Sequence, residues 1–413
     1  MTSSEIFVGL GLLLVLAVGC QIVATTLRVP AIVVLLPVGF VAGTMTSTID
    51  PNALFGAAFS PMVSLAVAVI LFEGGLDLNV KELEGHSQRI VRRLILWGVP
   101  MTWAGAGLLA WPLLGLSSRA AWMLGAILIV SGPTVVAPLL DRARPGPRLT
   151  AILGWEGTTI DPIGAIIGAL VFQAFNSGVG FRPTTELLEF ASNIGLGLLG
   201  GAAGTAVLWL LLEKVQLRGV LATEATIATV VAVAAACNAL RDDTGLIAAI
   251  AMGVAVANLP GIRSPEDRPF FRTMVQLIIG LLFISISATV TPSSIRDVLW
   301  PSVGLVACLI VVVRPLVAAA ATMRTNLTGR ERVFIGLMDP RGIVAASTAA
   351  TFAAPLAELG VVGADDLLPV TFLVIVGTVT IYGLAAAPAA RRLGLAPDAD
   401  DTPPGGSLSA AST

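Results

Sequence analysis

The chain has 413 residues, of which 56% are hydrophobic and only 12% are charged. Soluble domains carry about 25% charged residues, so this composition and the mean hydropathy of +0.91 exclude an ordinary water-soluble protein. The net charge of −2 gives no sign of a nucleic-acid partner.

Apolar runs of about 20 residues, the length that crosses a bilayer as a helix, recur along nearly the whole chain. Because backbone groups in lipid must be paired within the protein, we predict an all-α polytopic membrane protein. Thirteen spans are predicted, at about 5–27, 30–47, 57–76, 90–114, 119–140, 150–175, 187–212, 220–239, 244–259, 270–290, 296–322, 331–353 and 367–390.

The basic residues are distributed asymmetrically between these spans. Most of the 24 lysines and arginines fall at alternate connections or at the C-terminal end. The positive-inside rule therefore places the C-terminus in the cytoplasm and the N-terminus outside, as an odd number of spans requires.

Two predicted spans are interrupted by proline. The fifth contains SGPTVVAP, with Gly132 and Pro133, and the twelfth contains MDPRGIVAAS, with Pro340. A proline has no amide hydrogen and crowds the carbonyl four residues back, so the carbonyls of Ile129 and Gly336 should be freed. Broken helices at matching positions of two halves are typical of transporter binding sites.

The two breaks are seven spans apart, which is consistent with two six-helix units, spans 1–6 and 8–13, joined by span 7. Because an odd offset reverses direction in the membrane, we expect inverted repeats in which discontinuous helices 5 and 12 cross. Residue-level identity between the halves is not evident, so the symmetry is inferred from the spacing alone.

Ionisable side chains inside spans are costly and usually functional. Glu156 and Asp161 lie five residues apart in span 6, a net rotation of about 140° on a helix, so they face different neighbours and do not form an acid pair. The whole set is Glu73, Glu156, Asp161, Arg314, Asp339 and Arg341.

Asp161 lies near the middle of span 6 and precedes Pro162, which should release the carbonyl of Thr158. A carboxylate with freed carbonyls and threonine hydroxyls suits a small dehydrated alkali cation. The same carboxylate can take a proton instead, so one site can exchange H⁺ for a metal ion. The alternative is a structural acid that a neighbouring helix satisfies.

Glu156 needs a counter-charge, and Arg341 in the break of span 12 is the best candidate, because a bidentate pair neutralises both groups. A structural role for Glu156 is preferred over direct transport. Three roles stay open for Asp339: it joins this network, caps the second half-helix, or coordinates the ion.

Glu73 and Arg314 are interpreted as structural. Glu73 ends span 3 near the interface, with a role in ion access as the less favoured alternative. Arg314 precedes Pro315 in span 11, where it either snorkels or satisfies backbone carbonyls.

Four segments in order, LFEGGLDL, SGPTVVAPLL, WEGTTIDPIGA and PRGIVAAS, resemble the NhaP-like monovalent cation:proton antiporters, over about residues 5 to 392. The resemblance implies a homodimer in a prokaryotic inner membrane. It also implies a membrane domain, which we place at 1–395. The segment 396–413 is small, polar and rich in proline and glycine, so we expect a disordered cytoplasmic tail there and no soluble regulatory domain. In the membrane domain, core spans (about 90–175 and 296–390) move against dimerisation spans (about 5–76 and 220–290), with a linker span at about 187–212.

By the same resemblance, Asp161 binds cation and proton in turn, and Glu156 pairs with Arg341. Thr158, Ser131 and Thr134 are the further candidate ligands. Where many members have Thr-Asp-Pro in span 5, this chain has Ser131-Gly132-Pro133, so Asp161 carries a larger share of the site and Asp339 is a candidate replacement for the lost acid.

The predicted function is secondary active exchange of Na⁺ or K⁺ for H⁺ by an elevator-type mechanism, electroneutral, with no cofactor besides the transported ions. A passive cation channel is the alternative, although no filter-like repeat is present. An intramembrane enzyme is disfavoured, because the chain has no HExxH motif and its membrane aspartates lack a neighbouring glycine signature.

Overall fold

The computed structural model describes residues 2–27, 29–80, 85–176, 183–242, 244–262 and 268–396. The fold is entirely helical, with 84% of residues in helices and no strand within these ranges. The predicted disordered tail, beyond Ala396, lies outside the described residues.

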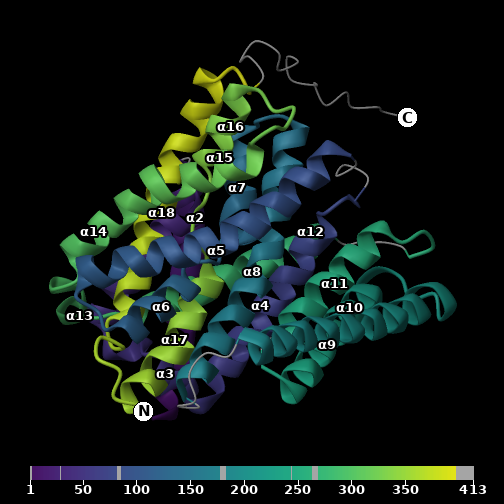
Figure 1. Ribbon diagram of the computed structural model, residues 1–413. Helices are drawn as coiled ribbons and strands as arrows, with labels where there is room; N and C mark the ends of the chain where they lie inside the picture. The colour runs from purple at the N-terminus through teal and green to yellow at the C-terminus, as the bar shows by residue number, and fades with distance from the viewer. Residues whose placement is uncertain are drawn as a thin grey trace.

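The helices form one bundle (Figure 1). The first half contains α1 (Ser3–Leu27), α2 (Ala31–Met45), η1 (Ser47–Ile49), α3 (Pro51–Phe55), η2 (Gly56–Ala58), α4 (Phe59–Leu76), α5 (His86–Leu114), α6 (Ser118–Ile127), α7 (Pro133–Ala143), α8 (Pro147–Asn176) and α9 (Pro183–Trp209). The second half contains η4 (Leu210–Lys214), α10 (Gly219–Leu240), α11 (Thr244–Asn258), α12 (Arg268–Ala288), α13 (Pro292–Arg296), α14 (Leu299–Cys308), η5 (Leu309–Val313), α15 (Arg314–Thr322), α16 (Gly329–Gly336), α17 (Ile343–Glu358) and α18 (Leu367–Arg392).

These elements confirm the predicted spans. Nine helical segments of the described residues are long and apolar enough to cross a membrane. The short helices α2 and α11 and the interrupted pairs α6/α7 and α16/α17 supply the other four of the thirteen. The chain is a multi-pass membrane protein.

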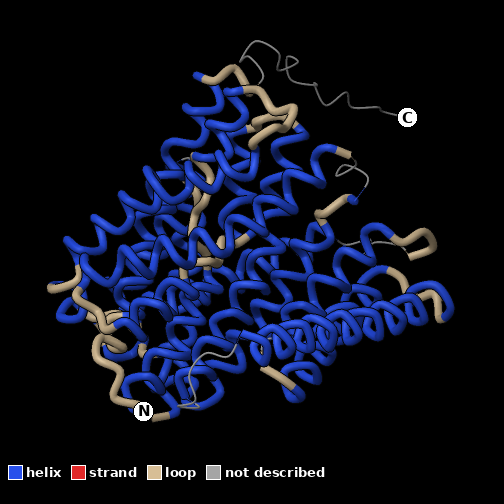
Figure 2. Tube along the Cα trace, viewed as in Figure 1, coloured by secondary structure: helices blue, strands red, loops and turns tan. Residues whose placement is uncertain are grey.

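Both predicted interruptions are present. The backbone leaves the helix after Ile127 and re-enters it at Pro133, and it leaves again after Gly336 and re-enters at Ile343. In Figure 1, α7 and α16 lie at one end of the bundle and α6 and α17 toward the other, so the two interrupted helices run in opposite directions. Figure 2 shows loop segments inside the bundle where the half-helices stop.

The two breaks cross at glycines. A Cβ added to Gly342 would lie 3.0 Å from the Cα of Gly132, a distance at which only hydrogen fits comfortably. Pro133 occupies the first turn of α7, where its missing amide costs nothing, and Pro340 lies in the non-helical segment before α17. The sequence thus places flexible and amide-free residues where the helices must stop and pass each other.

The eleventh span is also irregular. Between α14 and α15 the backbone makes one wide π-helical turn, Leu309–Val313, directly before Arg314. A π turn holds one more residue than an α turn and changes the direction of every side chain that follows. Arg314 is thereby buried in the bundle, 3% exposed, in a helix whose preceding residues Val311 and Val312 are exposed.

The α4 and α11 helices approach so closely that their backbones touch. A Cβ on Gly75 would lie 2.8 Å from the carbonyl oxygen of Ile250 and 3.1 Å from the Cα of Gly253. A Cβ on Gly253 would overlap the carbonyl of Phe72. Small residues at helix interfaces permit such contact, which is a main source of stability between helices in lipid.

We therefore expect Gly253→Leu to separate α4 from α11 and lower the thermal midpoint of the detergent-purified protein by roughly 5 °C or more. The matched control is Gly195→Leu in α9, where an added Cβ meets nothing within 4 Å. Both variants are measured by fluorescence-detected thermal unfolding, and equal midpoints for the two would contradict the packing described here.

Candidate functional site

Asp161 lies in the middle of α8, which continues through Pro162 as one helix. Its side chain is 1% exposed, and neither carboxylate oxygen has a hydrogen-bond partner among the described residues. A buried carboxylate without partners is costly, since burying a charge is favourable only when another group compensates it. The Asp161 carboxylate is thus buried with both oxygens free to accept a bond.

The first break brings a second oxygen to this carboxylate. A Cβ at Gly132 would lie 3.2 Å from Oδ2 of Asp161 and 3.2 Å from the hydroxyl of Thr134. The Thr134 hydroxyl is also buried without a partner. The predicted ligands Asp161 and Thr134 therefore flank the same glycine.

The other two predicted ligands lie on the same two segments. Ser131 is buried, and its carbonyl faces α8, 3.3 Å from the position of a Cβ on Gly157. Thr158 is buried one turn before Asp161 and donates its hydroxyl hydrogen to the Gly154 carbonyl at 2.8 Å. That bond leaves the Thr158 oxygen with acceptor capacity only.

Two helix N-termini meet near Asp161. Helix α7 starts after Gly132 and α17 starts after Gly342, and neither N-cap is satisfied by a side chain. A helix N-terminus carries about half a positive charge, so the two ends repel each other unless negative charge lies between them. The Asp161 carboxylate supplies that charge beside Gly132.

The predicted pairing of Glu156 with Arg341 is wrong. Both oxygens of Glu156 accept hydrogen bonds from Arg314, at 2.6 and 2.9 Å. Both side chains are almost fully buried, with 3% and 4% of their surfaces exposed. Arg314 therefore forms a bidentate pair, and it also donates to the carbonyl of Ile335 at the end of α16, at 3.1 Å.

Arg341 instead connects the two breaks. One terminal nitrogen donates to the carbonyls of Ile129 and Val130, at 3.2 and 3.3 Å, where α6 has ended. The carbonyl of Ile129 is the one that Pro133 was expected to free. The other terminal nitrogen binds Oδ2 of Asp339 at 2.8 Å. The arginine of one broken helix thus satisfies the backbone of the other.

Of the three roles left open for Asp339, the contacts favour the ion-pair network. Asp339 binds Arg341, and its second oxygen lies 4.0 Å from Arg314. It does not cap α17, whose N-cap is Gly342. The charges of two acids and two bases cancel along this series of contacts, which runs Glu156, Arg314, Asp339 and Arg341. Among the buried carboxylates of the described residues, Asp161 is thus left without an ion-pair partner.

Sequence reasoning missed two contributors. Arg314 was interpreted as structural, and no acid was named as its partner. The signal was present, because the two buried acids Glu156 and Asp339 need two buried bases, and Arg341 is only one. Thr378 of α18 accepts a hydrogen bond from the Arg341 amide at 3.2 Å, and no feature of the sequence distinguishes it from other span threonines.

Glu73 lies outside this cluster. It is 19% exposed near the end of α4 and pairs with Arg272 of α12 at 3.2 Å. Asp77 binds the same guanidinium at 2.8 Å. These contacts support the structural interpretation of Glu73 as a link between α4 and α12.

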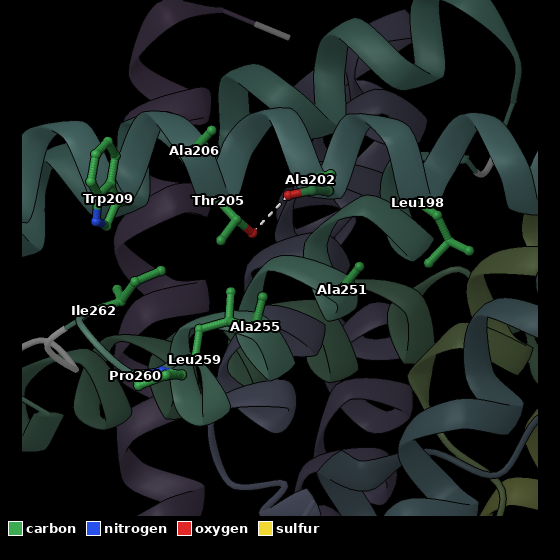
Figure 3. Close-up of a pocket in the computed structure, with 11 residues that line it drawn as sticks. Leu198, Ala202, Thr205, Ala206, Trp209, Ala251, Ala255, Leu259, Pro260 and Ile262 are labelled. Atoms are coloured by element: carbon green, nitrogen blue, oxygen red, sulfur yellow. Dashed lines mark hydrogen bonds between the residues drawn. The ribbon is translucent and has the colours of Figure 1, made fainter.

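A separate groove of about 580 Å³ opens between α9 and α11 (Figure 3). It is lined by Leu198, Gly201, Ala202, Thr205, Ala206, Trp209, Ala251, Ala255, Leu259, Pro260 and Ile262. Thr205 bonds the Gly201 carbonyl, and no described lining residue is ionisable. The groove is therefore lined mainly by apolar side chains.

The ligand set also limits the ion. No group of three or more His, Cys, Asp or Glu side chains that could hold a metal occurs in the described parts of the chain. Calcium and magnesium prefer several carboxylate oxygens or a hydrated shell. One carboxylate with hydroxyl and carbonyl oxygens, as at Asp161, fits a monovalent cation better.

Comparison with known proteins agrees with this geometry. The family described as "Sodium/hydrogen exchanger, transmembrane" matches residues 12–392. The K(+)/H(+) antiporter NhaP2 of Shewanella sp. (strain ANA-3) is 25% identical over 384 residues, covering 89% of this chain and 63% of that protein. The Na(+)/H(+) antiporter 1 of Methanocaldococcus jannaschii is 23% identical over 361 residues, covering 83% and 82% respectively.

The chain thus spans less than two thirds of the length of the Shewanella protein. Among solved structures, the sodium proton antiporter MjNhaP1 from Methanocaldococcus jannaschii at pH 8 matches with a TM-score of 0.82 and 19% identity, covering 94% of this chain and 99% of that one. That likeness shows a shared fold. Since the family pattern extends over nearly the whole chain, the protein belongs to the sodium/hydrogen exchanger family.

Proposed function

We propose that this protein exchanges a monovalent cation for a proton across the membrane, with both ions bound in turn at Asp161. The observation that carries the proposal is the buried Asp161 carboxylate, which has no partner where the two broken helices cross. Competition for one carboxylate couples the two ions, because the empty charged site is expensive to carry through a bilayer.

The proposed movement is of the elevator type. Helices α5–α8 and α14–α18 form the core that carries the site, and α1–α4 with α10–α12 form the scaffold, joined by α9. Since Asp161, Arg341 and both breaks all belong to the core, the site can move as one body. The positive-inside rule supports an outside N-terminus and a cytoplasmic C-terminus in a prokaryotic inner membrane.

The cation is Na⁺ or K⁺ in this proposal. The relative in Shewanella is named for K⁺ and the relative in Methanocaldococcus for Na⁺, so names alone do not choose between them. We also propose a homodimer in which the scaffold helices form the interface.

Asp161→Asn should abolish cation-dependent proton movement in proteoliposomes containing a pH-sensitive dye, because an amide has no exchangeable acid proton and no charge to attract a cation. The matched control is Glu73→Gln, which neutralises a membrane acid outside the cluster and should retain exchange with Na⁺ or K⁺. Normal exchange by Asp161→Asn would refute the mechanism, and loss of exchange in both variants would point to a different ion path.

The exchange should be electroneutral, because one carboxylate binds either one monovalent cation or one proton. A Na⁺ or K⁺ concentration jump on a solid-supported membrane should therefore give no sustained transport current, while dye-loaded vesicles from the same preparation report proton release. A current in proportion to the dye signal would contradict one-for-one exchange.

Glu156 and Arg314 should serve stability more than ion binding. Arg314→Met leaves Glu156 buried without a counter-charge, which typically costs about 3–5 kcal/mol. The thermal midpoint should fall by several degrees, and the double variant Glu156→Leu/Arg314→Met should recover part of that loss. Recovery stays partial, because the Ile335 carbonyl also loses its donor. A single variant as stable as the parent would show that the pair is dispensable.

A further inference from the structure

Two opposite charges lie close together at the crossing without pairing. Asp161 lies beside Gly132, and Gly132 touches Gly342, the residue that follows Arg341. Both Asp161 oxygens and the Nε–H of Arg341 nevertheless lack hydrogen-bond partners among the described residues. Both side chains are buried, so an ion pair between them would be favourable if the guanidinium could turn toward the carboxylate. Some other contact must hold it away.

The contacts of Arg341 identify that restraint. One terminal nitrogen is bound by the carbonyls of Ile129 and Val130, and the other by Asp339 at 2.8 Å. A guanidinium is planar and rigid, so fixing both terminal nitrogens also fixes the direction of the Nε–H bond. Of these contacts, only the one to Asp339 carries a full charge.

We propose that Asp339 is a positioning residue that holds Arg341 away from Asp161 and thereby sets the cation affinity and working pH range of exchange. The inference rests on the proposed function, in which Asp161 is the carboxylate that binds both ions. Asp339 does not touch the transported ion in this proposal.

The charges that face Asp339 support this assignment. Arg314 of α15 is already bound through both terminal nitrogens to Glu156 of α8, and its nearer nitrogen lies 4.0 Å from Asp339. Among the described residues, Tyr382 of α18 is a further buried titratable side chain near this cluster. Without Asp339, two arginines would share one glutamate, and Asp161 would be the nearest free carboxylate for Arg341.

The consequence for exchange has a definite sign. An arginine paired with Asp161 repels a metal cation and also favours the charged carboxylate, so protonation would require a lower pH. Loss of the Asp339 charge should therefore weaken cation binding and move the pH profile of exchange toward acid. A purely structural aspartate would lower the maximal rate or the yield without moving the profile.

The test compares Asp339→Asn with the parent protein in proteoliposomes, using Na⁺ and K⁺ as the probe cations across a series of pH values. Asparagine keeps the shape of the side chain and removes its charge. We expect the apparent KM to rise roughly tenfold and the profile to move by about one pH unit toward acid, the size of effect typical of an opposite charge within about 4–6 Å. The matched control is Asp77→Asn, which removes an aspartate paired with Arg272 in the scaffold and should leave KM and profile unchanged.

The double variant Asp339→Asn/Arg341→Gln separates electrostatics from folding. It restores the charge balance and keeps a donor for the Ile129 and Val130 carbonyls, so KM and pH profile should return toward the parent values. If Asp339→Asn is folded but has the parent KM and profile, or if the double variant is further displaced than the single one, the assignment is wrong. If Asp339→Asn does not fold, the double variant decides alone: a parent-like profile supports the assignment, and a displaced one overturns it.

The outcome for Asp339 can be distinguished from failure of the proposed function. If the parent protein does not exchange either cation for protons, the proposed function itself fails. If the parent exchanges and Asp161→Asn does not, the function stands, and the behaviour of Asp339→Asn then tests the positioning role by itself.

Discussion

Helices that stop inside a membrane leave backbone carbonyls where no water can bond them, and the solution to that problem organises this protein. The end of α6 is bound by Arg341, and the end of α16 is bound by Arg314. Each arginine is itself buried and so requires an acid, which explains Asp339 and Glu156. Four of the buried charges thus follow from two interruptions of the backbone.

The two interruptions do not account for the fifth buried charge, Asp161. It lies beside the N-terminal end of α7, whereas the two arginines lie at the C-terminal ends of α6 and α16. Positive side chains therefore meet the negative helix ends and a carboxylate meets a positive one, as the helix dipole favours. The side chains at the ends of α6, α16 and α7 therefore agree in charge with the helix dipoles, and the Asp161 carboxylate stays without a hydrogen-bond partner among the described residues.

The sequence was sufficient for the spans, the two breaks and the place of the buried acid Asp161 in the middle of span 6. Those features depend on local patterns: apolar length, proline and glycine placement, and a rare buried acid. The partner of Glu156 was not predictable in this way. Both arginines lie far along the chain from residue 156, and the choice between them depends on how α15 is rotated against α8, a property of tertiary packing.

That rotation is set by the wide turn at Leu309–Val313. Because this turn stores one additional residue, the same five residues wound at ordinary helical pitch would swing everything after them by about 100°. Arg314 would then point away from Glu156 and Ile335, although no side chain in the pair had been altered. The ion pair therefore depends on the backbone shape of span 11 as well as on the two side chains that form it.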